Sequence, residues 1–227
     1  MRGWSALLLV LLLAGCIASK PARVDPADYD AFYLWAGVKP QPVLAKAKTL
    51  YILDAEVRRG GHWVPLRAGV PKLDHAEVWL VVRATTLDWN DAIRAAILRD
   101  LTKWRAVGLQ VDFDASTQGL ADYAAFLRQL RQHLPRTYKL SVTGLMDWSA
   151  NGDPAALGQL SGVVDEVVVQ SYQGRRTIPG YARYLEKLAR VPVPHKVALV
   201  QGGAWSEPPE LRRDPLFRGY VVFLLNP

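Results

Sequence analysis

The sequence predicts a small (β/α)8 barrel, in which eight parallel strands close into a ring that helices surround. Eight short apolar stretches, most of them rich in β-branched or aromatic residues, recur along the chain. Helical patterns separate several of these stretches, which is typical of parallel βα units. The chain has 227 residues, of which 50% are hydrophobic, so it is long enough for one such domain with a sizeable core.

The expected strands and helices alternate along most of the chain. The eight expected strands are residues 32–35, 50–57, 77–84, 108–114, 139–145, 163–170, 196–200 and 219–225. Between the later strands, residues that favour helix starts occur at Asn90, at Ser116 or Thr117, at Asp153-Pro154 and at Pro179. The helix from about residue 118 is expected to end before Pro135.

The first units of the barrel are the least regular part of this prediction. Residues 57–73 contain Gly60, Gly61, Pro65, Gly69 and Pro71 and show no helical pattern. We therefore expect either irregular early units or a hairpin there. An open doubly wound sheet is the alternative architecture, but the glycine-rich nucleotide turn of such folds does not follow the first strand.

The N-terminus has the features of a targeting segment. Arg2 precedes an apolar run at 6–14 that is short for a membrane span, as in a signal peptide. The segment Leu13-Ala14-Gly15-Cys16 resembles the lipobox of bacterial lipoproteins, in which the cysteine becomes the lipid-carrying N-terminus. The chain is thus expected to comprise a signal peptide at 1–15, a lipidated Cys16 with a tether at 16–28, and a barrel at 29–227.

That resemblance also implies a location. Acyl chains on Cys16 would anchor the protein to a membrane of the bacterial cell envelope. Residue 17 is Ile rather than the Asp that favours retention at the inner membrane in such lipoproteins, which indicates the outer membrane, facing the periplasm. Cys16 is the single cysteine, so the sequence excludes an intramolecular disulfide and a cysteine metal cluster.

Two acids on the expected strand 108–114 are the central candidates for chemistry. Because strand side chains alternate between faces, Gln110, Asp112 and Asp114 share one face. In a barrel this face meets the other strand ends, which carry the remaining candidate ligand-binding residues: Trp35, Arg83, Asp147, Trp148, Gln170, Tyr172, Gln173 and Trp205. Carboxylates, amides and aromatic rings are the groups that hold and cleave sugars.

Composition and motifs argue against nucleic-acid binding, a metal site and a nucleotide cofactor. The formal net charge of +7 is scattered, without the basic runs and interleaved aromatics of nucleic-acid binders. The four histidines are far apart, which predicts no metal site, and no nucleotide-binding loop is present, so we expect no cofactor. The expected ligand is a polysaccharide or oligosaccharide, bound by a monomer.

Two family resemblances bear on these residues. The segment 108–114 resembles the fourth-strand Asp-x-Asp-x-Glu motif of chitinase-like glycoside hydrolases of family 18, with Gln110 at the first acid and Asp114 at the catalytic Glu. Gln170-Ser171-Tyr172 is similar to the sixth-strand pattern that holds the substrate's acetamido group in that family. More closely, residues 28–227 resemble the uncharacterised DUF3142 family, on the segments 110–115, 140–148 and 164–168.

These observations lead to three functional hypotheses. In the first, Asp114 is the general acid of a glycoside hydrolase, its pKa raised by Asp112, which stabilises positive charge or orients an acetamido group. Asp114 is one methylene shorter than the Glu it replaces, and a misplaced acid can cost about 10²-fold in rate. In the second, the same pocket binds a saccharide without cleaving it. In the third, the barrel is an envelope scaffold for a protein partner.

Overall fold

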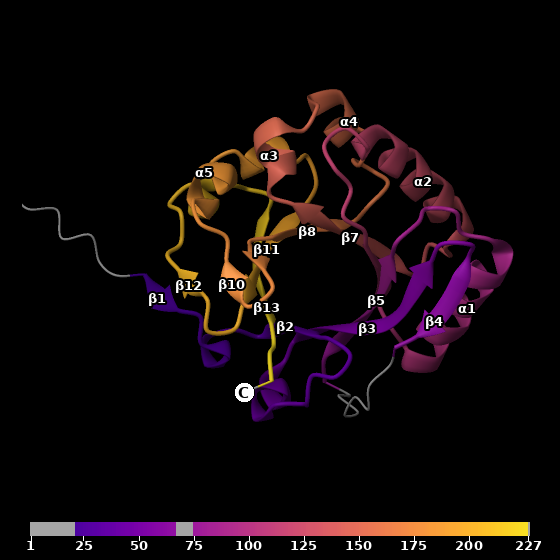
Figure 1. Cartoon of the computed structure of the whole chain (residues 1–227), viewed down its shortest axis with the longest axis horizontal. Coiled ribbons are helices and arrows are strands. Elements are labelled where there is room, and N and C mark those ends of the chain that lie inside the picture. Colours follow the sequence, from indigo (N-terminus) through magenta and orange to yellow (C-terminus); the bar gives the residue numbers. More distant parts are fainter. Residues whose placement is uncertain (1–20, 67–74, 227) are drawn as a thin grey trace, which may run out of the picture.

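The computed structural model describes residues 21–66 and 75–226, and these form a closed barrel of eight parallel strands. Figure 1 looks into this ring. In order around it, the strands are β2 (Ala31–Leu34), β13 (Phe217–Phe223), β11 (His195–Val200), β8 (Glu166–Gln170), β7 (Lys139–Leu145), β6 (Gly108–Asp112), β5 (Glu77–Ala84) and β3 (Thr49–Arg58). Parallel pairing of β2 with β3 closes the ring. The predicted barrel is therefore confirmed, and the open sheet is excluded.

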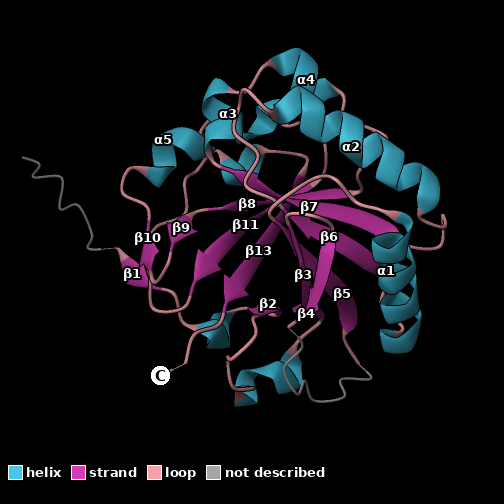
Figure 2. Cartoon of the chain, turned by 45° about the vertical axis from the view of Figure 1, so that its right-hand side comes forward, coloured by secondary structure: helices cyan, strands magenta, loops and turns pink. Residues whose placement is uncertain are grey.

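The α-helices lie outside the ring and cover part of it (Figures 1 and 2). They are α1 (Asp91–Trp104), α2 (Leu120–His133), α3 (Asp147–Asn151), α4 (Pro154–Gly158) and α5 (Tyr181–Leu185). Short 3-10 helices η1 (Pro26–Asp28), η2 (Pro42–Lys46), η3 (Leu188–Arg190) and η4 (Leu211–Arg213) complete the cover. Across the described ranges, every helix is too short or too polar to traverse a bilayer.

Most of the expected helix starts are present. The Asn90 side chain accepts a hydrogen bond from the Ile93 amide at 3.0 Å, and Asp153 caps α4 in the same way. The prediction for α2 was wrong by a few residues, because Ser116 accepts from the Gly119 amide and closes a turn before the helix begins. The helix after Pro179 begins at Tyr181.

A hairpin replaces the helix that a regular second unit would have. Strand β3 turns back at residues 59–61 into the antiparallel β4 (His62–Pro65), with Arg58 opposite His62. Gly60 and Gly61 have φ angles of 79° and 73°, a left-handed conformation that favours glycine. Of the two alternatives, the hairpin is thus confirmed, although residues 67–74 of this stretch lie outside the described residues.

Alternation along the strands separates two apolar cores. Outward residues such as Leu109 and Val111 pack in the core beneath the helices. Inward residues fill the barrel, where Tyr51 stacks on Trp79 with ring centroids 5.8 Å apart. Inward positions at the C-terminal ends of the strands are left to line a pocket.

The N-terminal part of the described chain is attached to the barrel. Strand β1 (Ala22–Arg23) pairs antiparallel with β12 (Ala204–Trp205), which follows β11. The signal peptide at 1–15 and Cys16 lie outside the described residues, so the proposed division of the chain before residue 21 stays a prediction.

Candidate functional site

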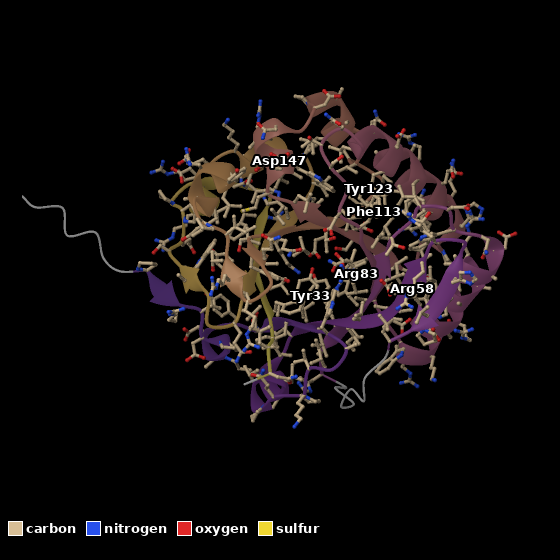
Figure 3. All side chains as sticks on the ribbon, viewed as in Figure 1. Tyr33, Arg58, Arg83, Phe113, Tyr123 and Asp147 are labelled. Carbon is tan, nitrogen blue, oxygen red and sulfur yellow. The ribbon has the colours of Figure 1, made fainter. Side chains whose placement is uncertain are left out.

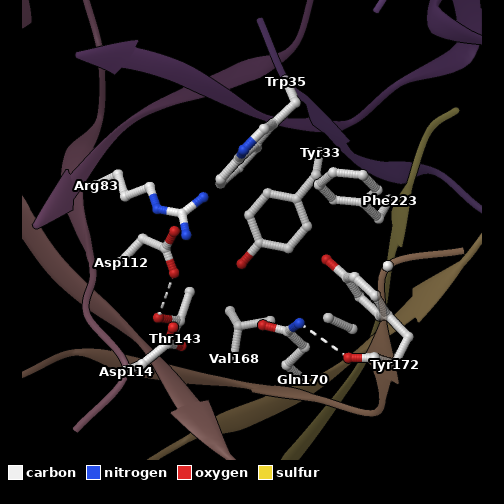
Figure 4. A pocket seen from close by; sticks show the side chains of 12 residues that line it. Tyr33, Trp35, Arg83, Asp112, Asp114, Thr143, Val168, Gln170, Tyr172 and Phe223 are labelled. Carbon is white, nitrogen blue, oxygen red and sulfur yellow. Dashed lines mark hydrogen bonds between the residues drawn. The ribbon is translucent and has the colours of Figure 1, made fainter. Parts of the chain in front are cut away.

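A pocket of about 260 Å³ lies at the C-terminal ends of the barrel strands. Figure 4 shows acidic and cationic side chains on one wall and aromatic rings on the opposite wall. Strands from both halves of the barrel and the loops that follow them contribute the lining: Tyr33, Trp35, Arg83, Asp112, Asp114, Thr143, Val168, Gln170, Tyr172, Gly174, Ala198 and Phe223. This is the end of a barrel where ligands generally bind.

Asp112 is the acid that the pocket encloses. Its Oδ1 accepts a hydrogen bond from Thr143 Oγ1 at 2.9 Å, and Arg83 is its register partner on β5. Burial is the largest influence on the Asp112 carboxyl and raises its pKa; the Thr143 hydrogen bond opposes this, Asp114 adds to it, and Arg83 opposes it. The ionised form of Asp112 is therefore disfavoured in the pocket, and a positive charge on a ligand would stabilise it.

Asp114 lies beyond the end of β6 and is exposed. It lines the first pocket and also a second cavity of about 510 Å³. Of the two acids, Asp112 is the one that the pocket encloses, and burial raises the pKa of its carboxyl. The reason is that β6 ends at Asp112, so the next inward position already projects into the open mouth.

Aromatic rings form the wall opposite the acids. Trp35 lies 5.7 Å from Tyr33 and 5.4 Å from Phe223, measured between ring centroids. Tyr172 packs 5.3 Å from Phe223 on the other side. Gln170 Nε2 donates to the Tyr172 backbone oxygen at 2.9 Å, which fixes the amide at the pocket edge. The wall offers flat apolar faces of the kind on which sugar rings stack.

The pocket floor belongs to a chain of hydrogen bonds that continues into the barrel. Tyr33 Oη donates to Gln110 Oε1 at 2.7 Å, and Gln110 Nε2 donates to Ser141 Oγ at 2.8 Å. Ser141 donates to Glu166 Oε1 at 3.2 Å, and Lys196 Nζ pairs with Glu166 Oε2 at 2.7 Å. Because the Tyr33 proton points to Gln110, its oxygen presents lone pairs to a ligand (Figure 4).

Gln110 therefore has a different place from the one predicted. It is 0% exposed and lies beneath the pocket rather than in its lining. It reaches the pocket only through Tyr33, because its inward position is one pleat below Asp112.

The second cavity extends the site on the outer side of Asp114. It shares Asp114, Gln170 and Tyr172 with the first pocket. Its other lining residues come from the end of β7, the start of α3, and the segment from β8 to α5: Leu145, Met146, Asp147, Gln173, Ile178 and Tyr184. Asp147 and Gln173, both predicted from the sequence, thus lie together in this second cavity.

Two of the predicted sugar-binding tryptophans lie outside the first two cavities. Trp148 is 0% exposed and its Nε1 donates to the Ala115 oxygen at 2.8 Å, so it belongs to the outer core. Trp205 is 7% exposed and stacks on Tyr181 with ring centroids 4.6 Å apart. Both residues come shortly after a barrel strand, Trp148 in α3 and Trp205 in β12, and both pack in the outer core. Position along the chain cannot show which way such a residue faces.

Tyr33, Thr143 and Phe223 also line the pocket and were not predicted from the sequence. Their signal was the period of two along each strand, since Tyr33 shares a face with Trp35 and Thr143 with Ser141. Figure 3 shows Tyr33 and Arg83 within the ring of strands. In the ranges 21–66 and 75–226, acids and histidines form no group of three suited to a metal ion.

A family model matches the part of the chain that carries the centre of this site. Residues 76–175 match DUF3142, a domain of unknown function. The match covers β5 to β8, and with them Arg83, Asp112, Asp114 and Gln170. No curated protein matches the chain significantly.

Solved structures show the same fold at low sequence identity. The chitinase domain of the spore coat protein CotE from Clostridium difficile is 15% identical, with a TM-score of 0.54 over 91% of this chain and 74% of that one. The family 18 chitinase ChiB from Flavobacterium johnsoniae is 14% identical, with a TM-score of 0.54 over 90% and 88%. The spore cortex-lytic enzyme SleL from Bacillus cereus is 19% identical, with a TM-score of 0.52 over 75% of this chain, which spans 49% of SleL. The chain thus shares the barrel fold of these structures.

Proposed function

We propose that this protein hydrolyses a glycosidic bond of an envelope or extracellular polysaccharide. The observation that carries the proposal is the position of Asp114 at the boundary of two adjoining cavities, with Asp112 enclosed beside it. A glycan that occupies both cavities has a linkage next to Asp114. The chitinase-like fold of the structural neighbours supports the same class of reaction.

In this proposal the two acids have different roles. Asp114, in the open mouth, donates its proton to the oxygen of the leaving sugar as the glycosidic C–O bond breaks. A water molecule then adds its hydroxyl to the cleaved ring and returns its other proton to Asp114. Asp112 lies deeper and stabilises the positive charge that develops on the cleaved ring, or orients a ring substituent that does so. Thr143 holds one Asp112 oxygen in place at 2.9 Å. The aromatic wall around Trp35 holds the ring.

Asp114→Asn tests the acid directly. We expect this variant to lose release of reducing ends from a panel of envelope and extracellular polysaccharides, by about 10²-fold or more, while it still binds them. Asp122→Asn is the matched control, because Asp122 is an exposed acid in the first turn of α2, on the outside of the barrel. Unchanged turnover in Asp114→Asn would refute the assignment of the acid.

A non-catalytic saccharide-binding protein is the second candidate. Exposure of Asp114 and its short side chain favour it, since a general acid works best when held against the glycosidic oxygen. In this case, calorimetry would show glycan affinity that falls in Trp35→Ala, and no reducing ends would appear after long incubation. Release of reducing ends by the parent protein would exclude this candidate.

We further propose that the protein is a monomer anchored by lipid on Cys16 to the outer membrane, on the periplasmic side. The lipobox-like segment before Cys16 supports the anchor. Labelling with radioactive palmitate should mark the parent protein, and Cys16→Ser should remove the label and release the protein from membranes. Equal labelling of both would disprove anchoring at Cys16.

A further inference from the structure

A third cavity continues the site away from the barrel axis. It has a volume of about 250 Å³ and is lined by Ala150, Asn151, Arg183, Tyr184 and Lys187. Tyr184 also lines the second cavity, which in turn shares three residues with the barrel pocket. The three cavities therefore follow one another from the acids of the barrel to the surface of α5.

The far end of this path is cationic. Arg183 and Lys187 are four residues apart, both are exposed, and within 21–66 and 75–226 neither has a carboxylate within 4.0 Å. Arg190 adds a third positive charge at the same edge, where its Nη1 donates to the Ala150 oxygen at 3.3 Å. Asp114 and Asp147 are the acids that line the neighbouring second cavity, and Asp147 Oδ1 already accepts a hydrogen bond from Asn151 Nδ2.

We propose that Arg183 and Lys187 bind an anionic group, a carboxylate, sulfate or phosphate, of an acidic polysaccharide whose chain lies along these cavities. This inference rests on the proposed function, because it takes the occupant of the barrel pocket to be a saccharide. The two cations lie at one end of the row of cavities, and the acids lie at its barrel end. This arrangement favours a polymer whose negative groups are spaced along the chain, so that one of them reaches the cations. An anionic membrane is the less suitable partner, because the two cations line a cavity continuous with the pocket.

Binding of short labelled glycans tests the proposal without reference to cleavage. The probes are fluorescein-labelled hexagalacturonate, a labelled heparin hexasaccharide, and the carboxyl-reduced neutral form of the first. Fluorescence anisotropy is measured with the full chain carrying Asp114→Asn, so that the probes stay intact. We expect Arg183→Gln/Lys187→Gln to weaken binding of an acidic probe about tenfold and to leave the neutral probe unchanged.

The matched control removes the same two charges elsewhere. Lys103 and Arg136 are exposed and lie near the ends of α1 and α2, away from the three cavities. Lys103→Gln/Arg136→Gln should weaken acidic binding by less than twofold. An equal loss in both double variants would show diffuse attraction by the net charge and would overturn the proposal.

Two further results would also overturn it. One is that neither acidic probe binds the parent more tightly than the neutral probe. The other is that Arg183→Gln/Lys187→Gln loses affinity for vesicles containing phosphatidylglycerol but not for the acidic probes, which would assign the cations to a membrane. Failure of the proposed hydrolysis would look different: the parent protein would release no reducing ends, but the binding differences between the variants would remain.

Discussion

Removal of the Lys196 ammonium tests how much the ion pair inside the barrel contributes to the stability of the fold. Lys196 Nζ lies 2.7 Å from Glu166 Oε2 and donates to Tyr51 Oη at 3.0 Å. The side chains of Lys196 and Glu166 are 16% and 11% exposed. Lys196→Met keeps most of the apolar volume and leaves the Glu166 charge without its cation.

The expected loss can be worked from these contacts. Breaking a fully buried ion pair by removing one partner costs about 3–5 kcal/mol. Here both side chains keep some solvent, and Glu166 still accepts hydrogen bonds from Tyr51 and Ser141. We therefore expect Lys196→Met to lower the free energy of unfolding by about 2–3 kcal/mol, and the melting temperature by about 5–10 °C.

Urea and thermal unfolding at neutral pH measure this loss. Glu166→Gln and the double variant complete a cycle, in which we expect a coupling energy of about 1–2 kcal/mol because the two groups act as a pair. Lys139→Met is the control, since Lys139 is exposed at the start of β7, and it should change stability by less than about 0.5 kcal/mol. A Lys196→Met protein as stable as the control, or a cycle without coupling, would refute the reasoning.

Three other variants test the site and its supports. Burial raises the pKa of Asp112 above its ordinary value of 3.8, so the contribution of Asp112 to stability is fully present below that value and is lost as pH rises through the folded-state pKa. In urea titrations, Asp112→Asn should therefore gain stability relative to the parent between about pH 3 and pH 7, and a difference that does not change with pH would contradict this. A Cβ at Gly108 would lie 2.5 Å from a backbone oxygen of the neighbouring strand, so Gly108→Ala should lose about 2–3 kcal/mol in urea unfolding while Gly158→Ala, with open space around it, stays within about 0.5 kcal/mol. Trp148→Phe loses the hydrogen bond to Ala115 and should cost about 1.5–3 kcal/mol by the same measurement, with glycan affinity unchanged; loss of affinity in the folded variant would return Trp148 to the site.

The sequence alone determined the barrel and much of its acid centre. Apolar stretches separated by helical patterns predict parallel βα units, because such strands must be covered on both faces. The period of two along residues 108–112 correctly placed Leu109 and Val111 outward and Gln110 and Asp112 inward. It also indicated a shared location for the strand ends, because parallel strands end at one edge of the barrel.

Only the tertiary structure decided depth, direction and neighbours. Asp112 is enclosed and Asp114 open because β6 ends between them, and no local pattern marks that end. Trp148 turned out to be core and Tyr33 to be pocket floor, because a ring's environment depends on which distant strand or helix covers it. The cationic cavity of Arg183 and Lys187 likewise exists because folding brings α5 beside α3, a contact between segments more than thirty residues apart.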